Sequence, residues 1–303
     1  MRGTALHTPE TVRAFLEKEL CADYGECESI LRGMAKRKTA FRLNALKMTE
    51  NTLSSVQKAV DCQSVDFLPG AFLTAASERE MLALSEAERG EIYLQSLSSM
   101  LPALALSPKA GEDILDMTAA PGGKTCQIAS LTKNGAHITA CEKDKVRAER
   151  LRYNLEKQGV RASVLVEDAR NLSDFLRFDR ILLDAPCSGS GTLDLGSERS
   201  CRAFSEELVK NCAALQKQLL FKAVNMLKTG GTLVYSTCSV LEKENGEAVR
   251  AALATKKVAL EPISFPFMEK LPLLHGKNAV EGTLTVAPDE EFEGFYLAVL
   301  KKL

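Results

Sequence analysis

Two cysteines have surroundings typical of a catalytic thiol, because each follows an apolar run and is flanked by small polar residues. Cys187 lies in the segment DAPCSGSG after the run 179–183, and Cys238 lies in the segment STCS after the run 232–236. Taken alone, most cysteines are small buried hydrophobic residues. A residue just beyond the carboxyl end of a strand in an open α/β sheet instead faces the ligand crevice, where a thiolate is a strong nucleophile near neutral pH.

Methylation of carbon 5 of a pyrimidine is a reaction that needs such a thiolate, because this carbon is not nucleophilic unaided. Addition of the thiolate to C6 lets C5 attack a sulfonium methyl group, and loss of the C5 proton then expels the thiol. Asp184, three residues before Cys187, is expected to contact the base edge and to support protonation at N3. Amine methylation, the alternative, usually places Asn/Asp-Pro-Pro-aromatic here, whereas this chain has Asp-Ala-Pro-Cys without an aromatic ring.

A small-residue turn and three acidic residues at strand ends predict the cofactor. Residues 116–125 read DMTAAPGGKT, which is neither G-x-G-x-x-G nor a P-loop, since Thr118 stands where a P-loop needs glycine. Glu142, Asp168 and Asp184 end the following strands and can accept hydrogen bonds from a ribose diol or an adenine amino group. An adenosine that carries a cationic sulfonium suits these acids better than a pyrophosphate does. The predicted cofactor is therefore S-adenosylmethionine.

These side chains are positioned by strands and helices that alternate from about residue 111 onward. This alternation, with Gly-rich turns between elements, predicts a doubly wound α/β sheet with mainly parallel strands. The expected strands cover residues 113–117, 137–141, 163–166, 179–183, 232–236 and 294–300, and the expected helices cover 124–131, 145–158 and 206–227.

The N-terminal part has a different character. Residues 8–34 are expected to be helical, because Thr8 and Pro9 form a helix-start signal before apolar positions at helical spacing. The whole chain of 303 residues has a net charge of −1, yet residues 31–58 hold seven basic side chains and one acid, a local charge of +6. This segment is either a solvated face or a polyanion-binding surface. A domain boundary is expected near residue 100, which separates residues 1–100 from a catalytic domain at 101–303.

Composition argues against several other classes. The N-terminus has no apolar core of a signal peptide, and no run of about 18 apolar residues predicts a membrane span. Nine cysteines cannot all pair, no two have C-x-x-C spacing, and the three histidines lie far apart, so neither a disulfide framework nor a metal site is expected. We expect a cytoplasmic monomer with mostly free thiols.

At this point the residues resemble the RNA (cytosine-5)-methyltransferases of the Sun type, which include RsmB. The resemblance is carried by residues 116–125, by 184–191 (DAPCSGSG) and by 234–239 (VYSTCS), with weaker matches at 41–47, 93–96 and 293–298. It covers roughly residues 35–300. It implies a Rossmann-like S-adenosylmethionine-dependent methyltransferase with a small N-terminal α+β domain of RNA-recognition type, which acts on ribosomal or transfer RNA, ribosomal being favoured.

The resemblance also implies roles for individual residues. Cys238 matches the nucleophile, and Cys187 matches the cysteine that helps to release the product. Three features depart from the family pattern: Thr118 replaces a frequent Cys, Glu142 replaces Asp, and residues 194–199 lack the usual basic stretch and Trp. The implied cofactor contacts are Thr118, Ala119, Ala120, Pro121, Gly122, Gly123, Lys124, Glu142, Arg147, Asp168 and Asp184.

The basic segment supplies the expected RNA contacts, and three aromatic residues are candidates to stack the extruded base. Two alternatives stay open: a non-catalytic RNA-binding ribosome-assembly factor with the same fold, and a methyltransferase acting on protein or DNA. The expected RNA contacts are Lys36, Arg37, Lys38, Arg42, Asn44 and Lys47, and the stacking candidates are Tyr235, Phe204 and Phe178.

Overall fold

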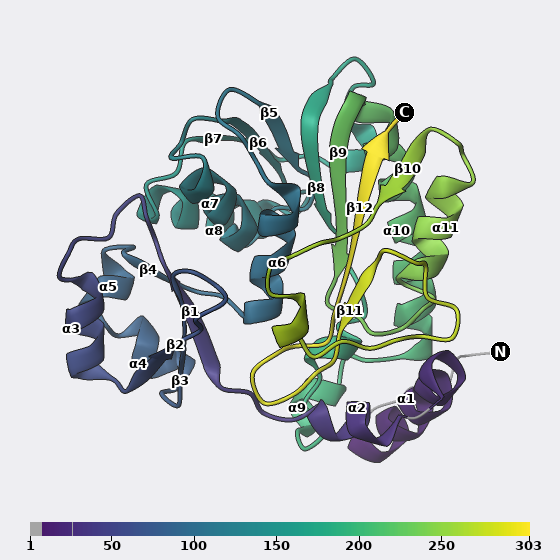
Figure 1. The fold of residues 1–303 in the computed structure, drawn as a ribbon, viewed down its shortest axis with the longest axis horizontal. Helices are drawn as coiled ribbons and strands as arrows, with labels where there is room; N and C mark the ends of the chain where they lie inside the picture. The colour runs from purple at the N-terminus through teal and green to yellow at the C-terminus, as the bar shows by residue number, and fades with distance from the viewer. Residues whose placement is uncertain (1–7, 26) are drawn as a thin grey trace.

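The computed structural model describes residues 8–25 and 27–303, and its centre is an eight-stranded sheet (Figure 1). The strand order is β10-β12-β9-β8-β5-β6-β7, with β11 paired to β12. The five strands from β9 to β7 are parallel, and β12 runs antiparallel to β9. The strands are β5 (Asp113–Asp116), β6 (His137–Cys141), β7 (Ala162–Leu165), β8 (Phe178–Asp184), β9 (Leu227–Thr237), β10 (Val258–Glu261), β11 (Leu284–Val286) and β12 (Phe295–Lys302).

The chain enters this sheet at β5, builds outward to β6 and β7, and then returns to the other side of β5 with β8 and β9. The order therefore reverses between β5 and β8, which is the position where open α/β sheets bind ligands. This doubly wound arrangement confirms the expected fold class. The predicted strands and helices of the sheet agree closely with the observed ones, except that β9 begins five residues earlier than predicted.

Helices cover both faces of the sheet because successive strand residues point to opposite sides. In β8, Ile181 and Leu183 pack with α10 and α11, whereas Leu182 packs with α6 and α7 on the other face. The helices that surround the sheet are α6 (Leu97–Leu106), α7 (Gly123–Leu131), α8 (Lys145–Lys157), α9 (Glu198–Cys201), α10 (Glu206–Met226) and α11 (Gly246–Leu253).

A second, four-stranded antiparallel sheet with the order β2-β3-β1-β4 lies beside the large sheet (Figure 1). Phe41 and Phe72 stack at its centre and pack against Val56 and Met81 of its helices. Its elements are β1 (Thr39–Leu43), α3 (Thr52–Ala59), β2 (Cys62–Ser64), β3 (Ala71–Thr74), α4 (Glu78–Leu82), α5 (Ser85–Glu88) and β4 (Ile92–Leu94).

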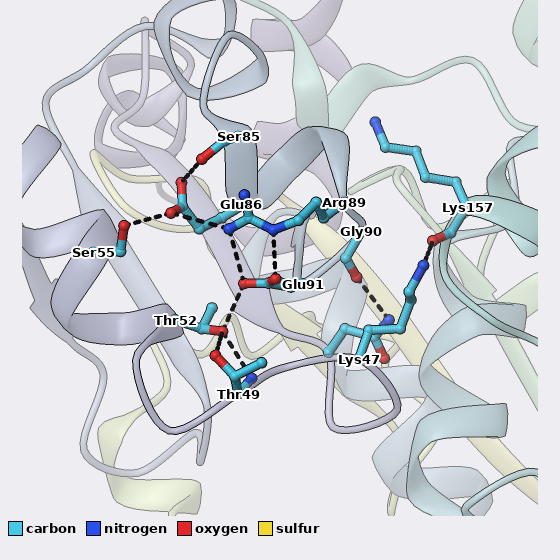
Figure 2. A network of polar contacts seen from close by, with 11 residues as sticks. Lys47, Thr49, Thr52, Ser55, Ser85, Glu86, Arg89, Gly90, Glu91 and Lys157 are labelled. Atoms are coloured by element: carbon cyan, nitrogen blue, oxygen red, sulfur yellow. Dashed lines mark hydrogen bonds and ion pairs between the residues drawn. The ribbon is translucent and has the colours of Figure 1, made fainter.

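A polar network ties this small sheet together (Figure 2). Arg89 lies between two buried carboxylates and bonds to Glu91 at 2.6 Å and to Glu86 at 3.3 Å. Thr52 donates to Glu91 at 2.7 Å and Ser55 donates to Glu86 at 2.5 Å, so the two acids also anchor α3. Buried carboxylates are tolerated when charge and hydrogen bonds compensate them in this way.

The first helices do not belong to that small sheet. Helix α1 (Pro9–Tyr24) begins at the predicted cap, Thr8, and packs with α2 (Glu28–Gly33) against elements of the large-sheet domain. Val12, Leu16 and Leu20 share a core with Phe204, Val209, Val240 and Leu241. Within residues 8–25 and 27–94, the structure thus shows a helical corner packed on the large-sheet domain and a small sheet spanning 39–94.

Cys21 and Cys27 form a disulfide in this corner, which the sequence analysis did not anticipate. The other seven cysteines, all within the described residues, are free thiols. None of the helices described in residues 8–25 and 27–303 is long and apolar enough to cross a membrane.

Candidate active site

The two cysteines singled out by the sequence meet in space. Strands β8 and β9 are adjacent and parallel, with Asp184 opposite Ser236, so the loops that follow them leave the sheet side by side. The Sγ atoms of Cys187 and Cys238 are 3.0 Å apart. The backbone N–H of Gly191 donates to the carbonyl of Cys238 at 3.0 Å and fixes the two loops against each other.

The environment of this pair distinguishes the two thiols. The contact with Cys238 and burial together raise the pKa of Cys187 well above its usual value. Cys238 lies on the wall of two cavities, whereas Cys187 lines one of them. Cys238 is therefore the thiol that a ligand in either cavity could reach.

Asp184 and Lys124 form an ion pair beside the cysteines, with 2.7 Å between Lys124 Nζ and an Asp184 carboxylate oxygen. Ser236 donates to the other oxygen at 2.7 Å, and Lys124 also donates to Ser99 at 2.7 Å. Burial lowers the pKa of Lys124, but Asp184 outweighs that effect, so the net pKa is raised and the ammonium stays charged. Thr118 completes the group by donating to the Asp184 carbonyl at 2.8 Å.

A cavity of about 190 Å³ lies at the carboxyl ends of β5, β6 and β8. Six of the predicted cofactor residues line it, and five do not. Ala119, Pro121, Gly123 and Lys124 face a second, larger cleft, and Gly122 lines neither. The six lining residues are Thr118, Ala120, Glu142, Arg147, Asp168 and Asp184.

The turn between β5 and α7 is held in a fixed shape. Gly122 has φ of +109°, in the left-handed region that favours glycine. Helix α8 anchors the preceding carbonyls, because Arg147 donates to Ala120 at 2.9 Å and Asn154 donates to Pro121 at 2.7 Å. A turn fastened in this way presents its backbone to a ligand without having to rearrange.

The acids of the small cavity are themselves oriented. Glu142 accepts from the Asp144 N–H at 2.9 Å, and Arg147 lies 3.6 Å from its other oxygen. Asp168 accepts from Arg170 at 2.6 Å, and hydrogen bonds from Arg170 lower the pKa of Asp168 to about 2. Both carboxylates can thus accept further hydrogen bonds from a diol or an amino group.

The larger cleft, of about 740 Å³, runs between the small sheet and the catalytic domain. Thr118, Ala120, Asp184 and Cys238 line both this cleft and the smaller cavity, so the two spaces meet at these residues. A base held in the cleft would contact Cys238 on one side and a cofactor on the other.

The structure corrects the expected RNA contacts. Arg42 and Asn44 are only 5% and 1% exposed, so they do not face RNA. Arg42 donates to Gln95 at 2.8 Å and to the Gly123 carbonyl at 3.1 Å. Asn44 donates to the carbonyls of Gly90 and Gln158, both at 2.9 Å. These two residues join the small sheet to the catalytic domain instead.

Of the other predicted RNA contacts in the basic segment, two bond to backbone carbonyls of other segments and the other two line the large cleft. Arg37 donates to the carbonyls of Gly191 and Phe292, so it secures the loop after Cys187. Lys47 donates to the Lys157 carbonyl at 3.2 Å, a link visible in Figure 2. Lys36 and Lys38 line the large cleft.

The three stacking candidates are also corrected. Tyr235, Phe204 and Phe178 are at most 6% exposed and belong to hydrophobic cores, so none can stack on a base. The aromatic side chains that line the large cleft are Tyr93 and Phe295. Among residues 8–25 and 27–303, no group of three or more His, Cys, Asp or Glu side chains could hold a metal ion.

Two buried carboxylates of the site, Asp116 and Glu244, are absent from the residues that the sequence predicted. Asp116 lines the large cleft and accepts from Thr125 at 2.6 Å, and burial raises its pKa to about 6. The sequence signal for Asp116 is its position as the last residue of β5, directly before the turn, where open α/β sheets bind ligands. Glu244 binds to both cysteine loops, but no spacing rule connects it to them.

Comparison with known proteins now identifies the family. The family model for the 16S rRNA methyltransferase RsmB/F matches residues 103–301. The chain belongs to the RsmB/F family of RNA (cytosine-C5)-methyltransferases. The match covers every active-site residue on the large sheet, including both cysteine segments.

Curated RsmB/F relatives differ in their named substrates. The chain is 34% identical to a tRNA (cytosine(49)-C(5))-methyltransferase of Pyrococcus abyssi, with 87% of this chain and 88% of that protein aligned. It is 36% identical to ribosomal RNA small subunit methyltransferase F of Vibrio vulnificus, with 87% of this chain and 57% of that protein aligned. The chain thus spans little more than half the length of the Vibrio relative.

Solved structures share the RsmB/F fold. A methyltransferase homologue from Pyrococcus horikoshii has a TM-score of 0.81 and 32% identity, with 95% of both chains covered. NSun6 from Pyrococcus horikoshii with SFG also has a TM-score of 0.81, at 22% identity over 98% of both chains. This agreement supports the overall fold described above.

Proposed function

We propose that this RsmB/F protein methylates carbon 5 of a cytosine in RNA with S-adenosylmethionine, through a covalent bond between Cys238 and C6 of the base. The observation that carries the proposal is the position of Cys238, which lies where the two cavities meet and 3.0 Å from Cys187. Ribosomal RNA is the proposed substrate class, as for the Vibrio relative, with transfer RNA the competing one.

The residues of the small cavity fit S-adenosylmethionine. Two oriented carboxylates, Glu142 and Asp168, can accept from the ribose and the adenine, and the fixed turn at 118–122 leaves space for the ligand. When bound there, S-adenosylmethionine supplies an electrophilic methyl group to the adjoining cleft. SFG, found with one solved relative of this fold, is an analogue of S-adenosylmethionine.

The chain's own residues account for activation of the base. The Cys238 thiolate adds to C6, and the electron pair of the C5=C6 bond becomes available at C5. The Asp184–Lys124 pair lies beside Cys238 and is placed to contact the polar edge of the base. A fixed ion pair of this kind stabilises charge that develops on the ring without a reorganisation cost.

Release of the product reverses the thiol addition. Loss of the proton from methylated C5 restores the C5=C6 double bond and expels Cys238 as a thiolate. Cys187 lies within contact distance of that sulfur and is the residue proposed to assist this step. A non-catalytic assembly factor would have no use for two thiols and an ion pair converging on one junction.

The proposal is tested by methyl transfer from labelled S-adenosylmethionine to unmodified ribosomal RNA, transfer RNA and DNA of matched sequence. We expect transfer to RNA only, its complete loss in Cys238→Ala, and normal transfer in Cys62→Ala, a free thiol on β2 remote from the site. Methyl transfer that survives Cys238→Ala would exclude the nucleophile. Bisulfite sequencing of RNA from cells that lack the protein would identify the target nucleotide.

A further inference from the structure

Glu244 is a fully buried carboxylate that the mechanism above does not use. Its Oε1 accepts from the Ser188 N–H at 2.7 Å and from Gln216 at 3.3 Å. Its Oε2 accepts from the hydroxyls of Ser188 at 2.5 Å and Ser239 at 2.6 Å. A buried carboxylate with this many donors is costly to place and has a defined orientation.

The donors to Glu244 come from both cysteine loops. Ser188 directly follows Cys187, and Ser239 directly follows Cys238. The hydroxyls of Ser190 and Ser239 are a further 2.9 Å apart, which closes the connection between the loops. Glu244 therefore joins the two cysteine loops through side chains, in addition to the direct Ser190–Ser239 contact.

The charge state of Glu244 follows from its partners. A carboxylate anion only accepts hydrogen bonds, and donors converge on both of its oxygens, so the anion satisfies all of them. Burial raises the pKa of Glu244 above its usual value, and the bonds from Ser188 and Ser239 oppose this rise without cancelling it. The negative charge of Glu244 also raises the pKa of Cys187.

We propose that Glu244 is a positioning residue that holds the two cysteine loops in register and keeps the proton of the thiol pair on Cys187, so that Cys238 is the sulfur that reacts as a thiolate. This inference rests on the proposed function. It adds the reason why two adjacent thiols take different roles. Glu244 accepts from both the N–H and the hydroxyl of Ser188, beside Cys187, but only from the hydroxyl of Ser239, beside Cys238. Cys238 instead faces the cleft that the Lys124 ammonium also lines.

Other titratable groups around the pair must be considered in any pH-dependent test. Lys124 on α7 interacts electrostatically with Cys238, Tyr235 on β9 with Cys187, and Cys212 on α10 with Cys238. Burial raises the pKa of Tyr235 and that of Cys212, so both stay neutral near pH 7. Asp184 is the other carboxylate beside the pair, and its charge is balanced by the ion pair with Lys124. Glu244 is then the anion that biases the pair from the side of Cys187.

The test compares Glu244→Gln with Glu247→Gln, a control carboxylate three residues later that is partly exposed and paired with Lys217. In the unliganded protein, the rates of iodoacetamide alkylation at Cys187 and Cys238 are measured by peptide mass spectrometry between pH 6 and 9. Cys238 is expected to react about tenfold faster than Cys187 in the wild type and in Glu247→Gln, because the thiolate is the reactive form. In Glu244→Gln the two rates are expected to converge within about twofold.

Methyl transfer supplies the second readout. Glu244→Gln is expected to lower kcat about 30-fold or more with KM for RNA changed less than about threefold, because the contacts to RNA remain in place. Glu244→Asp is expected to recover part of the loss. An unchanged alkylation preference, or an unchanged kcat, in folded Glu244→Gln would overturn the inference.

Two features keep the outcome interpretable. Alkylation needs neither RNA nor S-adenosylmethionine, so it remains readable even if the wild-type protein transfers no methyl group and the proposed function fails. If Glu244→Gln does not fold, Ser188→Ala removes one hydroxyl donor and leaves the carboxylate in place. In Ser188→Ala, the ratio of the alkylation rate of Cys238 to that of Cys187 is expected to fall, as in Glu244→Gln. An unchanged ratio would contradict the proposal.

Discussion

The sulfur atoms of Cys187 and Cys238 are 3.0 Å apart, although 51 residues separate them in the chain. Helix α10 lies between them in the sequence and returns the chain to the same edge of the sheet. Because β8 and β9 are parallel neighbours, both loops leave that edge together. One pyrimidine at this position can be attacked by one thiol while the other stands close enough to assist its release.

Lys124 should act on the substrate rather than on the cofactor, since it lines the large cleft and not the small cavity. Lys124→Met is expected to lower kcat about 100-fold, because Asp184 loses the cation that fixes it. The Kd for S-adenosylmethionine, measured by calorimetry, should change by less than about threefold, with Lys145→Met on the exposed face of α8 as the control. A large loss of cofactor affinity would restore the role that the sequence implied for Lys124.

Asp116 should make stability depend on pH in a defined direction. Its folded pKa of about 6 lies above its ordinary value of 3.8, so its contribution to stability is full below 3.8 and is lost as pH rises through 6. Between pH 7 and pH 5 the wild type should gain about 1 kcal/mol relative to Asp116→Asn, which keeps an acceptor for Thr125. Urea unfolding of both proteins at the two pH values measures this difference, and equal shifts would rule it out.

Arg42 should stabilise the junction between the small sheet and the catalytic domain. Arg42→Met removes the bonds to Gln95 and to the Gly123 carbonyl, and is expected to lower the free energy of unfolding by about 2–4 kcal/mol. Lys47→Ala also removes a link between the two parts, but Lys47 is exposed, so a loss within about 0.5 kcal/mol is expected. Thermal unfolding of the two variants provides the comparison. Similar losses in the free energy of unfolding of both variants would show that the burial of Arg42 does not set its contribution to stability.

Lys36 and Lys38 are both exposed and line the large cleft, but Lys38 forms an ion pair with Glu291, so Lys36 is the candidate RNA contact chosen for the test. Lys36→Ala is expected to raise KM for RNA without lowering kcat, and to reduce the slope of log KM against log salt by about 0.7. Lys58→Ala is the matched control, because Lys58 belongs to the same basic segment but does not line the cleft. If both variants show the same salt slope as the wild type, RNA does not contact Lys36.

Local sequence patterns predicted the large sheet because short apolar runs alternate with segments of helical periodicity, and several of the turns between them contain Gly or Pro. The ends of β6, at His137 and Cys141, agree with the prediction, and both cysteine loops follow the predicted strands. The carboxyl ends of parallel strands lie at one edge of the sheet, so Glu142, Asp168 and Asp184 were expected to lie close together. All three line the small cavity.

The remaining features depend on contacts between distant segments, which composition does not encode. Arg42 and Asn44 have the side chains of an RNA-binding surface, yet tertiary packing buries both. The Cys21–Cys27 disulfide and the position of α1 on the catalytic domain carry no local signal either. Glu244 has the sequence context of an ordinary loop residue, and only its four donors distinguish it.

Cys238 is proposed to form a covalent bond to the base, and Cys187 is proposed to be needed to break that bond. The most direct measurement incubates Cys187→Ala with unmodified RNA and S-adenosylmethionine, followed by a denaturing gel. A stable protein–RNA adduct is expected in Cys187→Ala and none in the Cys187→Ala, Cys238→Ala double variant. An adduct that persists without Cys238, or no adduct in a folded Cys187→Ala protein that binds RNA, would contradict the assignment of the two thiols.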